Sequence, residues 1–417
     1  MLDLNIQKLV KIKKRNIYTC FAVALLYGFG EGGFFVVLQP ILLEITGSLF
    51  AVGLIMTTVS FVQVIIMPWI GKLMDNFGKK RLWLIGNPII IIGCFILIMA
   101  SDIIFAGMAV IMIYVGGVIY RMSSQMIISE SSDNSKKGFN FSFVFFASSG
   151  ASIFGFMLVL FDIGINYHFY IWIFIVMNLL IWLIVFSTLS PISSKFIKKQ
   201  ERNSMGTKPK QNTLFELLRT PKTRIILIFF TLNWFFYGIT STIWNAWFID
   251  TYGVNVQALA LFFLVANIFR MIFQIPSGHI IDKIGKKKAL VISLICCIIS
   301  SFISIFVFFT WSSGLVSILI PGYIMAIIFF TMYITIVFPV ESIYLTNLTE
   351  EKKAESFGTV KLITDGALIP TGVIGGSIAD FVHPIAPEII HLGGFILLLW
   401  FPIRSFNGMN HERVDDS

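Results

Sequence analysis

Long apolar stretches without charged residues recur along nearly the whole chain. The clearest is Leu290–Trp311, and residues 83–101 and 163–191 are similar. Each stretch reaches the roughly 20 residues that an α-helix needs to cross about 30 Å of hydrocarbon. Strands of a membrane barrel would instead alternate apolar and polar side chains over about 10 residues, and these stretches do not alternate. The pattern therefore predicts transmembrane helices.

Glycines, prolines and clusters of charge divide the chain into twelve predicted spans. They begin near Asn16, Leu49, Leu82, Ile104, Phe139, Tyr167, Arg224, Gln257, Ala289, Gly314, Phe357 and Glu388. Basic residues precede the first span, as in a signal peptide. Its apolar segment, from residue 16 to about 43, nevertheless exceeds the roughly 7–15 residues of a signal sequence, and Glu31 interrupts it. We expect this span to be retained, and we predict an all-α membrane protein with 12 transmembrane helices.

The overall composition agrees with this prediction. Of 417 residues, 57% are hydrophobic and 13% are charged, and the mean hydropathy is +0.87. A soluble domain carries about 25% charged residues, so this chain has too few charges for a water-facing surface. The net charge of +9 would by itself suggest a nucleic-acid partner. The positions of the basic residues explain that charge better.

The basic residues lie almost entirely on one side of the predicted membrane. With twelve spans, 28 of the 31 Lys and Arg residues fall in the termini and in the connections on that side, and none falls in the opposite connections. The other three, Arg121, Arg270 and Lys361, lie inside spans. Because cytoplasmic loops are rich in Lys and Arg, we predict a multi-pass protein of the cell (plasma) membrane with both termini cytoplasmic. We expect the protein to interact with the lipid bilayer and not with nucleic acid.

A short segment is repeated at the ends of the second and eighth spans. Residues 71–81 read GKLMDNFGKKR, and residues 278–288 read GHIIDKIGKKK. The Gly, Asp and Gly positions of the two copies are each 207 residues apart. Glycine permits a tight turn, an Asp can face the positive end of a neighbouring helix, and a basic run favours the cytoplasmic surface. With the basic linker 193–222 between them, the copies predict two repeated halves, residues 1–192 and 223–417.

These copies resemble the motif G-x-L-x-D-x-x-G-[RK]-[RK] of the major facilitator superfamily. The resemblance covers the span count, the central linker, the orientation and both copies. It implies two pseudo-symmetric six-helix bundles around a central cavity, which rock between inward-open and outward-open states. It also implies that the motif residues hold and release a cytoplasmic gate, namely Gly71, Asp75, Gly78 and Arg81 with Gly278, Asp282 and Gly285. The second copy departs from the motif at His279 and Ile280, where the first has Lys72 and Leu73.

Ionisable side chains inside the spans are the candidates for function, because charge is costly in a membrane. Glu31 lies midway along the first span, Arg121 in the fourth, Arg270 in the eighth and Glu341 in the tenth. In the family that the chain resembles, spans one, four, seven and ten line the cavity. The candidate substrate and proton cavity therefore comprises Glu31, Arg121, Arg270, Glu341, Gln125, Asn233, Trp234 and Tyr237.

Two interpretations of these charges compete. In the first, Arg121 and Arg270 attract an anionic group of the solute, and Glu31 or Glu341 accepts a coupling proton, because burial of a carboxyl group favours its protonated form. In the second, the arginines and glutamates form static ion pairs that hold the helices in register. The sequence favours the functional interpretation for Glu31 and Arg121, and it leaves the two even for Arg270 and Glu341.

Other classes of protein fit the sequence less well. No Cys/His cluster has metal-ligand spacing, and the chain carries neither the nucleotide-binding motif G-x-x-x-x-G-K-[ST] nor a catalytic motif within its spans. We predict a non-enzymatic secondary transporter of a small organic solute, functional as a monomer, with no cofactor and driven by the proton gradient. The alternatives are a multidrug-type efflux antiporter and a uniporter or exchanger of an anionic metabolite. The family's antiporter signature G-P-x-x-x-G-G is matched only in part at 150–156, which leaves the direction open.

Overall fold

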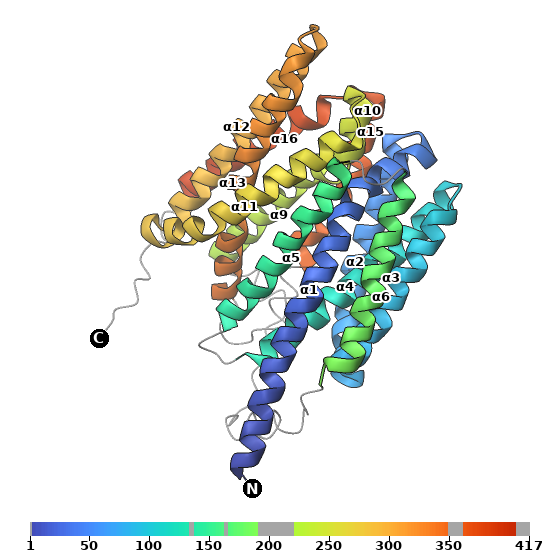
Figure 1. Ribbon diagram of the computed structural model, residues 1–417. Coiled ribbons are helices and arrows are strands. Elements are labelled where there is room, and N and C mark those ends of the chain that lie inside the picture. The colour runs from blue at the N-terminus through green and yellow to red at the C-terminus, as the bar shows by residue number, and fades with distance from the viewer. Residues whose placement is uncertain (1, 133–136, 162–165, 191–220, 349–361, 406–417) are drawn as a thin grey trace. The chain divides into compact units, whose positions relative to one another are not determined.

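The computed structural model describes residues 2–132, 137–161, 166–190, 221–348 and 362–405 (Figure 1). Within these ranges, 12 helices are long and apolar enough to cross a membrane, and no strand is present. The twelve-span, all-helical prediction is therefore confirmed. The predicted starts at Leu49, Ile104 and Tyr167 fall within one residue of the observed ones.

The first six spans are six single helices. In chain order they are α1 (Leu2–Thr46), α2 (Leu49–Phe77), α3 (Lys79–Met99), α4 (Ile103–Ser131), α5 (Lys137–Leu160) and α6 (Tyr167–Thr188). Polar residues begin two of them. Asp102 accepts hydrogen bonds from the first amide groups of α4, at 2.8 and 2.9 Å, and Asn166 caps α6 in the same way.

The last six spans contain two broken helices. The elements are α9 (Pro221–Ser241), α10 (Trp244–Tyr252), α11 (Val256–Ile284), α12 (Lys286–Ser312), the 3₁₀ turn η2 (Val316–Ile318), α13 (Leu319–Leu348), α15 (Thr371–Phe381) and α16 (Ala386–Ser405). The seventh span is divided between α9 and α10 by a turn, and in the eleventh span α15 starts directly after Pro370. Proline has no amide hydrogen for a helical bond and restricts the residue before it, so a new helix readily starts there.

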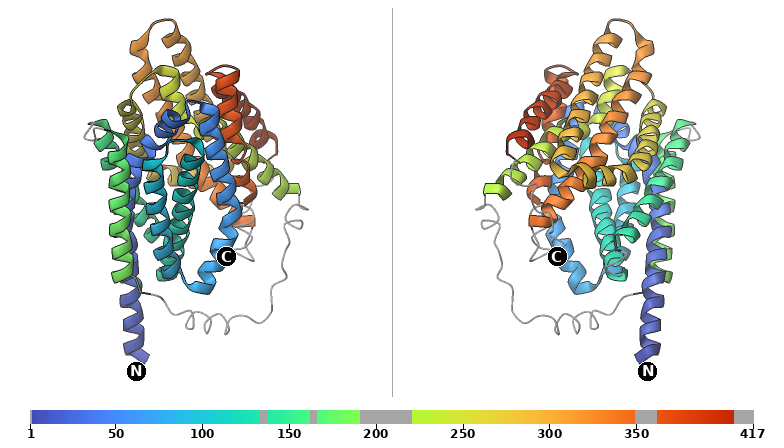
Figure 2. Two further views of the ribbon diagram at one scale, coloured as in Figure 1. Left: turned by 90° about the vertical axis from the view of Figure 1, so that its right-hand side faces the viewer. Right: turned by 90° about the vertical axis from the view of Figure 1, so that its left-hand side faces the viewer.

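The chain folds into two compact units, viewed from two further sides in Figure 2. The N-terminal unit comprises residues 1–45 and 61–210, and the C-terminal unit comprises 46–60 and 211–417. Helix α2 therefore belongs to the C-terminal unit at its start and to the N-terminal unit for the rest of its length. The predicted boundaries at 192 and 223 stay a prediction, because residues 191–220 lie outside the described ranges.

The first turns of α2 are joined to α15 by close backbone packing. A Cβ atom at Gly53 would overlap the carbonyl group of Gly372, and Thr57 Oγ1 accepts a 2.9 Å hydrogen bond from the amide of Val373. Asp380 accepts hydrogen bonds from Phe50 N at 2.7 Å and from the Ser48 hydroxyl at 2.8 Å. The acid thereby satisfies an orphan amide at the positive end of α2. These contacts explain why residues 46–60 group with the later spans.

Small residues also bring helices together inside the N-terminal unit. A Cβ atom at Gly155 in α5 would overlap the carbonyl oxygen of Phe29 in α1, and one at Gly86 in α3 would overlap Ile119 in α4. Glycine at such positions lets two helix backbones approach closely, which is how packing is achieved between helices in lipid.

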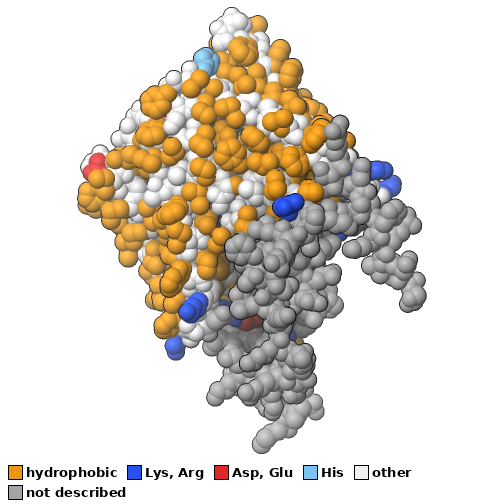
Figure 3. Space-filling model, turned by 180° about the vertical axis from the view of Figure 1, so that it is seen from behind, with side chains coloured by type: hydrophobic (Ala, Val, Ile, Leu, Met, Phe, Trp, Pro, Cys, Tyr) orange, Lys and Arg blue, Asp and Glu red, His pale blue; other side chains and the backbone are white. Residues whose placement is uncertain are grey.

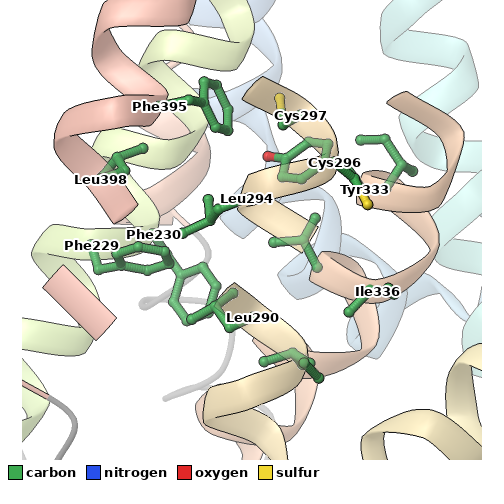
Figure 4. Packing of buried hydrophobic residues seen from close by; sticks show 14 of the residues in the cluster. Phe229, Phe230, Leu290, Leu294, Cys296, Cys297, Tyr333, Ile336, Phe395 and Leu398 are labelled. Carbon is green, nitrogen blue, oxygen red and sulfur yellow. The ribbon is translucent and has the colours of Figure 1, made fainter. Parts of the chain in front are cut away.

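The core of the C-terminal unit is a hydrophobic cluster between α9, α12, α13 and α16 (Figure 4). Its labelled members are Phe229, Phe230, Leu290, Leu294, Cys296, Cys297, Tyr333, Ile336, Phe395 and Leu398. The surface is apolar as well. Figure 3 shows hydrophobic side chains over much of the described surface on the face it draws, with few charged atoms among them. A surface of this kind is stable against lipid rather than water.

Candidate functional site

Glu31 lies in α1 of the N-terminal unit, one turn after Tyr27. The Tyr27 hydroxyl donates a hydrogen bond to the Glu31 carboxylate, and Arg121 of α4 interacts with the same carboxylate electrostatically. Both groups lie beside Gly117, since the Tyr27 hydroxyl and Arg121 Nη1 are 3.6 and 3.7 Å from where its Cβ would be, which is an ordinary contact distance. A negative group, a positive group and a phenol therefore meet between α1 and α4.

Aromatic rings hold Tyr27 in place. Its ring stacks on that of Tyr120, with centroids 3.9 Å apart and planes inclined by 13°, and it meets the ring of Phe174 edge-on at 5.8 Å. Such contacts restrict the ring and so fix the position of its hydroxyl. Glu31 is half-buried, whereas Arg121 and Gln125, one turn further along α4, are exposed on the unit.

Glu341 lies in α13 of the C-terminal unit and is almost completely buried, with 1% of its surface exposed. Its Oε1 accepts a 3.0 Å hydrogen bond from Nε1 of Trp234 in α9. The indole nitrogen is only a donor, so this bond suits a carboxylate oxygen. A carboxyl group buried at this depth in a membrane span requires a function or a partner, and Trp234 is one partner.

Asn233, next to Trp234 in α9, carries an unpaired donor. Its Oδ1 accepts a 3.1 Å hydrogen bond from the hydroxyl of Tyr333, but Nδ2 is buried and has no hydrogen-bond partner among the described residues. An unsatisfied buried donor costs about 1–3 kcal/mol, so such atoms usually bind water or a ligand. Asn233 Nδ2 is therefore a candidate position for a bound polar molecule in this unit.

Tyr237 of α9 and Arg270 of α11 are a second pair of interest in the C-terminal unit. Tyr237 hydrogen-bonds Ser241 and interacts electrostatically with the guanidinium of Arg270. Arg270 is exposed on its unit, and no acidic group among the described residues pairs with it. This differs from Arg121, which has Glu31 beside it.

The structure thus groups the predicted residues into two sets. One set, Glu31 with Arg121, lies in the N-terminal unit, and the other, Asn233, Trp234, Tyr237, Arg270 and Glu341, lies in the C-terminal unit. Gln125 is placed near Arg121 only by its helical spacing. The prediction that these residues share one cavity stays a prediction. Of the partners, Tyr120 and Phe174 were missed by sequence reasoning, because aromatic residues are too frequent in these spans to stand out.

The two repeated segments have the same backbone conformation at their second glycine. Gly78 has φ 88° and ψ 143°, and Gly285 has φ 83° and ψ 153°. The Gly78 amide bonds the carbonyl of Met74, and the Gly285 amide bonds that of Ile281, both at 3.0 Å. Each glycine ends one helix and begins the next, in a region of backbone angles that side chains disfavour. The repeat in sequence is therefore a repeat in geometry.

Basic residues of the first segment contact neighbouring helices. Lys79 forms an ion pair with Glu130 near the end of α4, and Lys80 donates hydrogen bonds to the carbonyl groups of Phe186 and Leu189, at 2.8 and 2.6 Å. A lysine there satisfies carbonyls at a helix C-terminus. Of the predicted gating residues, Gly71 is half-buried and Arg81 exposed, while the side chains of Asp75 and Asp282 and the surroundings of Gly278 lie outside what is described.

Comparison with known proteins identifies the family. The sequence profile described as Major Facilitator Superfamily matches residues 20–365. The chain belongs to the major facilitator superfamily. This is a family of membrane transporters, not of enzymes, and its members bind small solutes. Among the described residues, no group of three or more His, Cys, Asp or Glu side chains is placed to hold a metal ion.

Solved structures share the fold. The nucleoside transporter NupG aligns with a TM-score of 0.70 at 15% identity, covering 95% of this chain and 99% of that one. The inward-open xylose transporter XylE from E. coli aligns with a TM-score of 0.70 at 14% identity, covering 93% and 96%. The human organic anion transporter MFSD10 (TETRAN) aligns with a TM-score of 0.64 at 14% identity, covering 94% and 99%. No curated protein matched the chain by sequence. At these identities the similarity establishes the fold alone.

Proposed function

We propose that this superfamily member is a proton-coupled secondary transporter of a small organic solute, with Glu31 as the group that binds the coupling proton. The observation that carries the proposal is the contact of Glu31 with both Tyr27 and Arg121. When Glu31 is ionised, its charge is balanced by Arg121. When Glu31 takes up a proton, Arg121 loses its counter-ion and becomes available to an anionic or hydrogen-bonding group of a solute.

The C-terminal unit carries candidate solute contacts of its own. Asn233 Nδ2 offers a buried donor, and Trp234 and Tyr237 lie on the same helix as potential contacts for a solute. Glu341 is held by Trp234, so a solute that displaces the indole would alter the surroundings of this carboxyl group. The two glycine-hinged segments at 71–81 and 278–288 are proposed to accompany opening and closing at the cytoplasmic side.

A second candidate is a uniporter or exchanger of an anionic metabolite. It is favoured by Arg270, an intramembrane guanidinium with no acidic partner among the described residues. A cation in a span without a counter-ion is stabilised when an anion binds beside it. This candidate requires no proton and is separated from the first by the response to a pH gradient.

The test is flux of labelled solutes into proteoliposomes that contain the purified full-length protein. The panel begins with a nucleoside (uridine), a pentose (D-xylose) and a dicarboxylate (succinate), because proteins of this fold are named as transporters of nucleosides, xylose and organic anions. Each solute is measured with and without an imposed pH gradient. We expect one class to accumulate only when the gradient is present.

Variants assign the roles. Glu31→Gln keeps the side-chain shape but cannot bind a proton as an acid, so it should abolish gradient-driven accumulation and spare solute exchange. Glu44→Gln, an exposed acid near the end of the same helix, is the matched control and should accumulate solute as the unmodified protein does. Flux that ignores the gradient, together with loss of transport in Arg270→Ala, would establish the anion exchanger instead.

The proposal extends to the location, orientation and oligomeric state of the protein. We infer that it lies in the plasma membrane with both termini in the cytoplasm, and that it acts as a monomer. The asymmetric distribution of Lys and Arg supports the orientation.

A further inference from the structure

Helix α16 carries a buried acid and a buried histidine that the proposed function does not use. Glu388 is 6% exposed and His391 is 3% exposed. Three residues apart on a helix, the two side chains lie on the same face. The sequence prediction treated Glu388 only as the start of the twelfth span, but α16 already begins at Ala386. Buried ionisable groups in membrane spans are rare and usually functional.

Hydroxyl and thiol groups from three other helices lie within electrostatic range of Glu388. It interacts electrostatically with Tyr252 at the end of α10, with Tyr323 near the start of α13 and with Cys297 in α12. The two tyrosine hydroxyls are 2.6 Å apart and hydrogen-bonded. No ion pair among the described residues includes Glu388. Helices α9 and α15 also pack on α16, and their described residues contribute no ionisable group that interacts with Glu388. Within the described part of the chain, the amino end of its own helix is the one feature that favours its charge.

His391 has a hydrogen-bonding neighbour at each of its two ring nitrogens. The Ser301 hydroxyl lies 3.1 Å from the carbonyl oxygen of Cys297 and 2.7 Å from His391 Nδ1, and we assign its hydrogen to the carbonyl, so that its oxygen accepts from Nδ1. In the neutral ring Nε2 is then an acceptor, and the Cys297 thiol lies 3.9 Å from it. The assignment makes Ser301, His391 and Cys297 one connected set of proton-bearing groups.

This set continues to the candidate site of the C-terminal unit. Cys297 interacts electrostatically with Tyr333, and both belong to the packed cluster drawn in Figure 4. The Tyr333 hydroxyl donates to Asn233, whose Nδ2 is the unpaired buried donor, and Tyr333 also interacts with Glu341. A water at Asn233 Nδ2 would complete the connection, since a buried orphan donor commonly holds one.

Together these groups span most of the thickness of the membrane. Tyr323 and Glu341 are 18 residues apart on α13, which at about 1.5 Å per residue is about 27 Å along the helix. The hydrocarbon layer is about 30 Å thick. By the orientation inferred above, Tyr252, Tyr323 and Glu388 lie toward the outer surface, where His383 in the turn before α16 is exposed.

We propose that Glu388 is a second proton-binding site of the transporter, reached from the outer surface and connected through Cys297 and Tyr333 to Glu341. This proposal rests on the proposed proton coupling. A proton from the outer aqueous phase is passed through the Tyr252–Tyr323 hydroxyl pair to the Glu388 carboxylate, which becomes a neutral carboxylic acid. The proton then passes by way of the groups around Cys297 and Tyr333 to the Glu341 carboxylate, which becomes neutral, and Glu388 returns to its charged form.

The first test needs no solute. Infrared difference spectra of the purified full-length protein are recorded between about pH 5 and about pH 9, and the carbonyl stretch of a protonated carboxyl group is followed. We expect a titrating band that is lost in Glu388→Gln, shifted in Glu388→Asp, and unchanged in Asp250→Asn, an exposed acid of the same unit. Glu388→Asp keeps the acid, so the test remains decisive if the glutamine variant folds poorly. An unchanged titrating band in Glu388→Gln would overturn the proposal.

The second test separates this proposal from the proposed function. A transported solute from the panel above is measured with an imposed pH gradient in the unmodified protein and in Glu388→Gln. Loss of gradient-driven accumulation in Glu388→Gln, with exchange retained, supports the connection to Glu341. Equal gradient dependence in both proteins refutes the connection while the proposed function stands. If the unmodified protein ignores the gradient, coupling itself is refuted, and the infrared result alone decides whether Glu388 binds a proton.

Discussion

Replacing either hinge glycine with alanine tests whether the two repeated segments are equivalent. Gly78 and Gly285 have φ values of 88° and 83° with nearly equal ψ values. No heavy atom lies within 4 Å of a Cβ built on Gly78, so the cost of Gly78→Ala comes from the backbone and not from a clash. A side chain in this conformation costs about 1–3 kcal/mol. We expect Gly285→Ala to cost about the same.

The variant with alanine at both Gly78 and Gly285 tests whether the two losses of unfolding free energy add. The two glycines belong to different units and share no partner, so their effects should add to about 2–6 kcal/mol. Equilibrium unfolding in mixed detergent micelles measures these differences. Gly150→Ala and Gly393→Ala are matched controls in the two units, since both glycines are helical with open space around them. Alanine should stabilise these helices by about 0.5–1 kcal/mol.

The reasoning is refuted if Gly78→Ala is as stable as Gly150→Ala. A large cost at Gly78 with none at Gly285 would show instead that the second segment, which departs from the family motif at Ile280, tolerates a different backbone conformation.

Three further outcomes follow from single contacts. Asp380→Ala removes the hydrogen-bond acceptor for Phe50 N and should destabilise the start of α2 by about 0.5–2 kcal/mol. Hydrogen exchange at the amides of residues 49–53 should then be faster, and unchanged exchange would contradict this prediction. Trp234→Phe removes the hydrogen bond to Glu341 and should lower the free energy of unfolding by about 1–3 kcal/mol. Trp244 packs on aromatic rings and makes no hydrogen bond to an acid among the described residues, so Trp244→Phe should cost less. Gly155→Ala should weaken the packing of α1 on α5 and lower thermal stability in detergent, and a stability equal to that of Gly150→Ala would be inconsistent with the close approach.

Much of the fold was predictable because a membrane imposes simple rules. A helix that crosses lipid must be long and apolar, and its backbone hydrogen bonds must be made within the helix. Spans such as Leu290–Trp311 are therefore evident from the sequence. The turn between α9 and α10 was not, because residues 241–243 carry no proline or glycine. The attachment of residues 46–60 to α15 was also missed, since it depends on glycines of two distant segments meeting.

The candidate site was predictable in its charges but not in their partners. Glu31 and Arg121 stand out because charge is rare in the spans, and the structure brings them together. Glu341 stands out for the same reason, yet its bond to Trp234 could not be foreseen among so many aromatic residues. Glu388 was missed because an acid at the end of an apolar stretch resembles a boundary. Its spacing of three residues from His391 was the available signal.

The central claim, that Glu31 couples solute movement to protons, is tested most directly by measuring proton flow driven by the solute. Proteoliposomes without an imposed pH gradient receive a transported solute, and a trapped dye reports the internal pH. The account predicts a pH change in the unmodified protein and in Glu44→Gln, and none in Glu31→Gln. Solute flow without a pH change in the unmodified protein, or an equal pH change in Glu31→Gln, would contradict it.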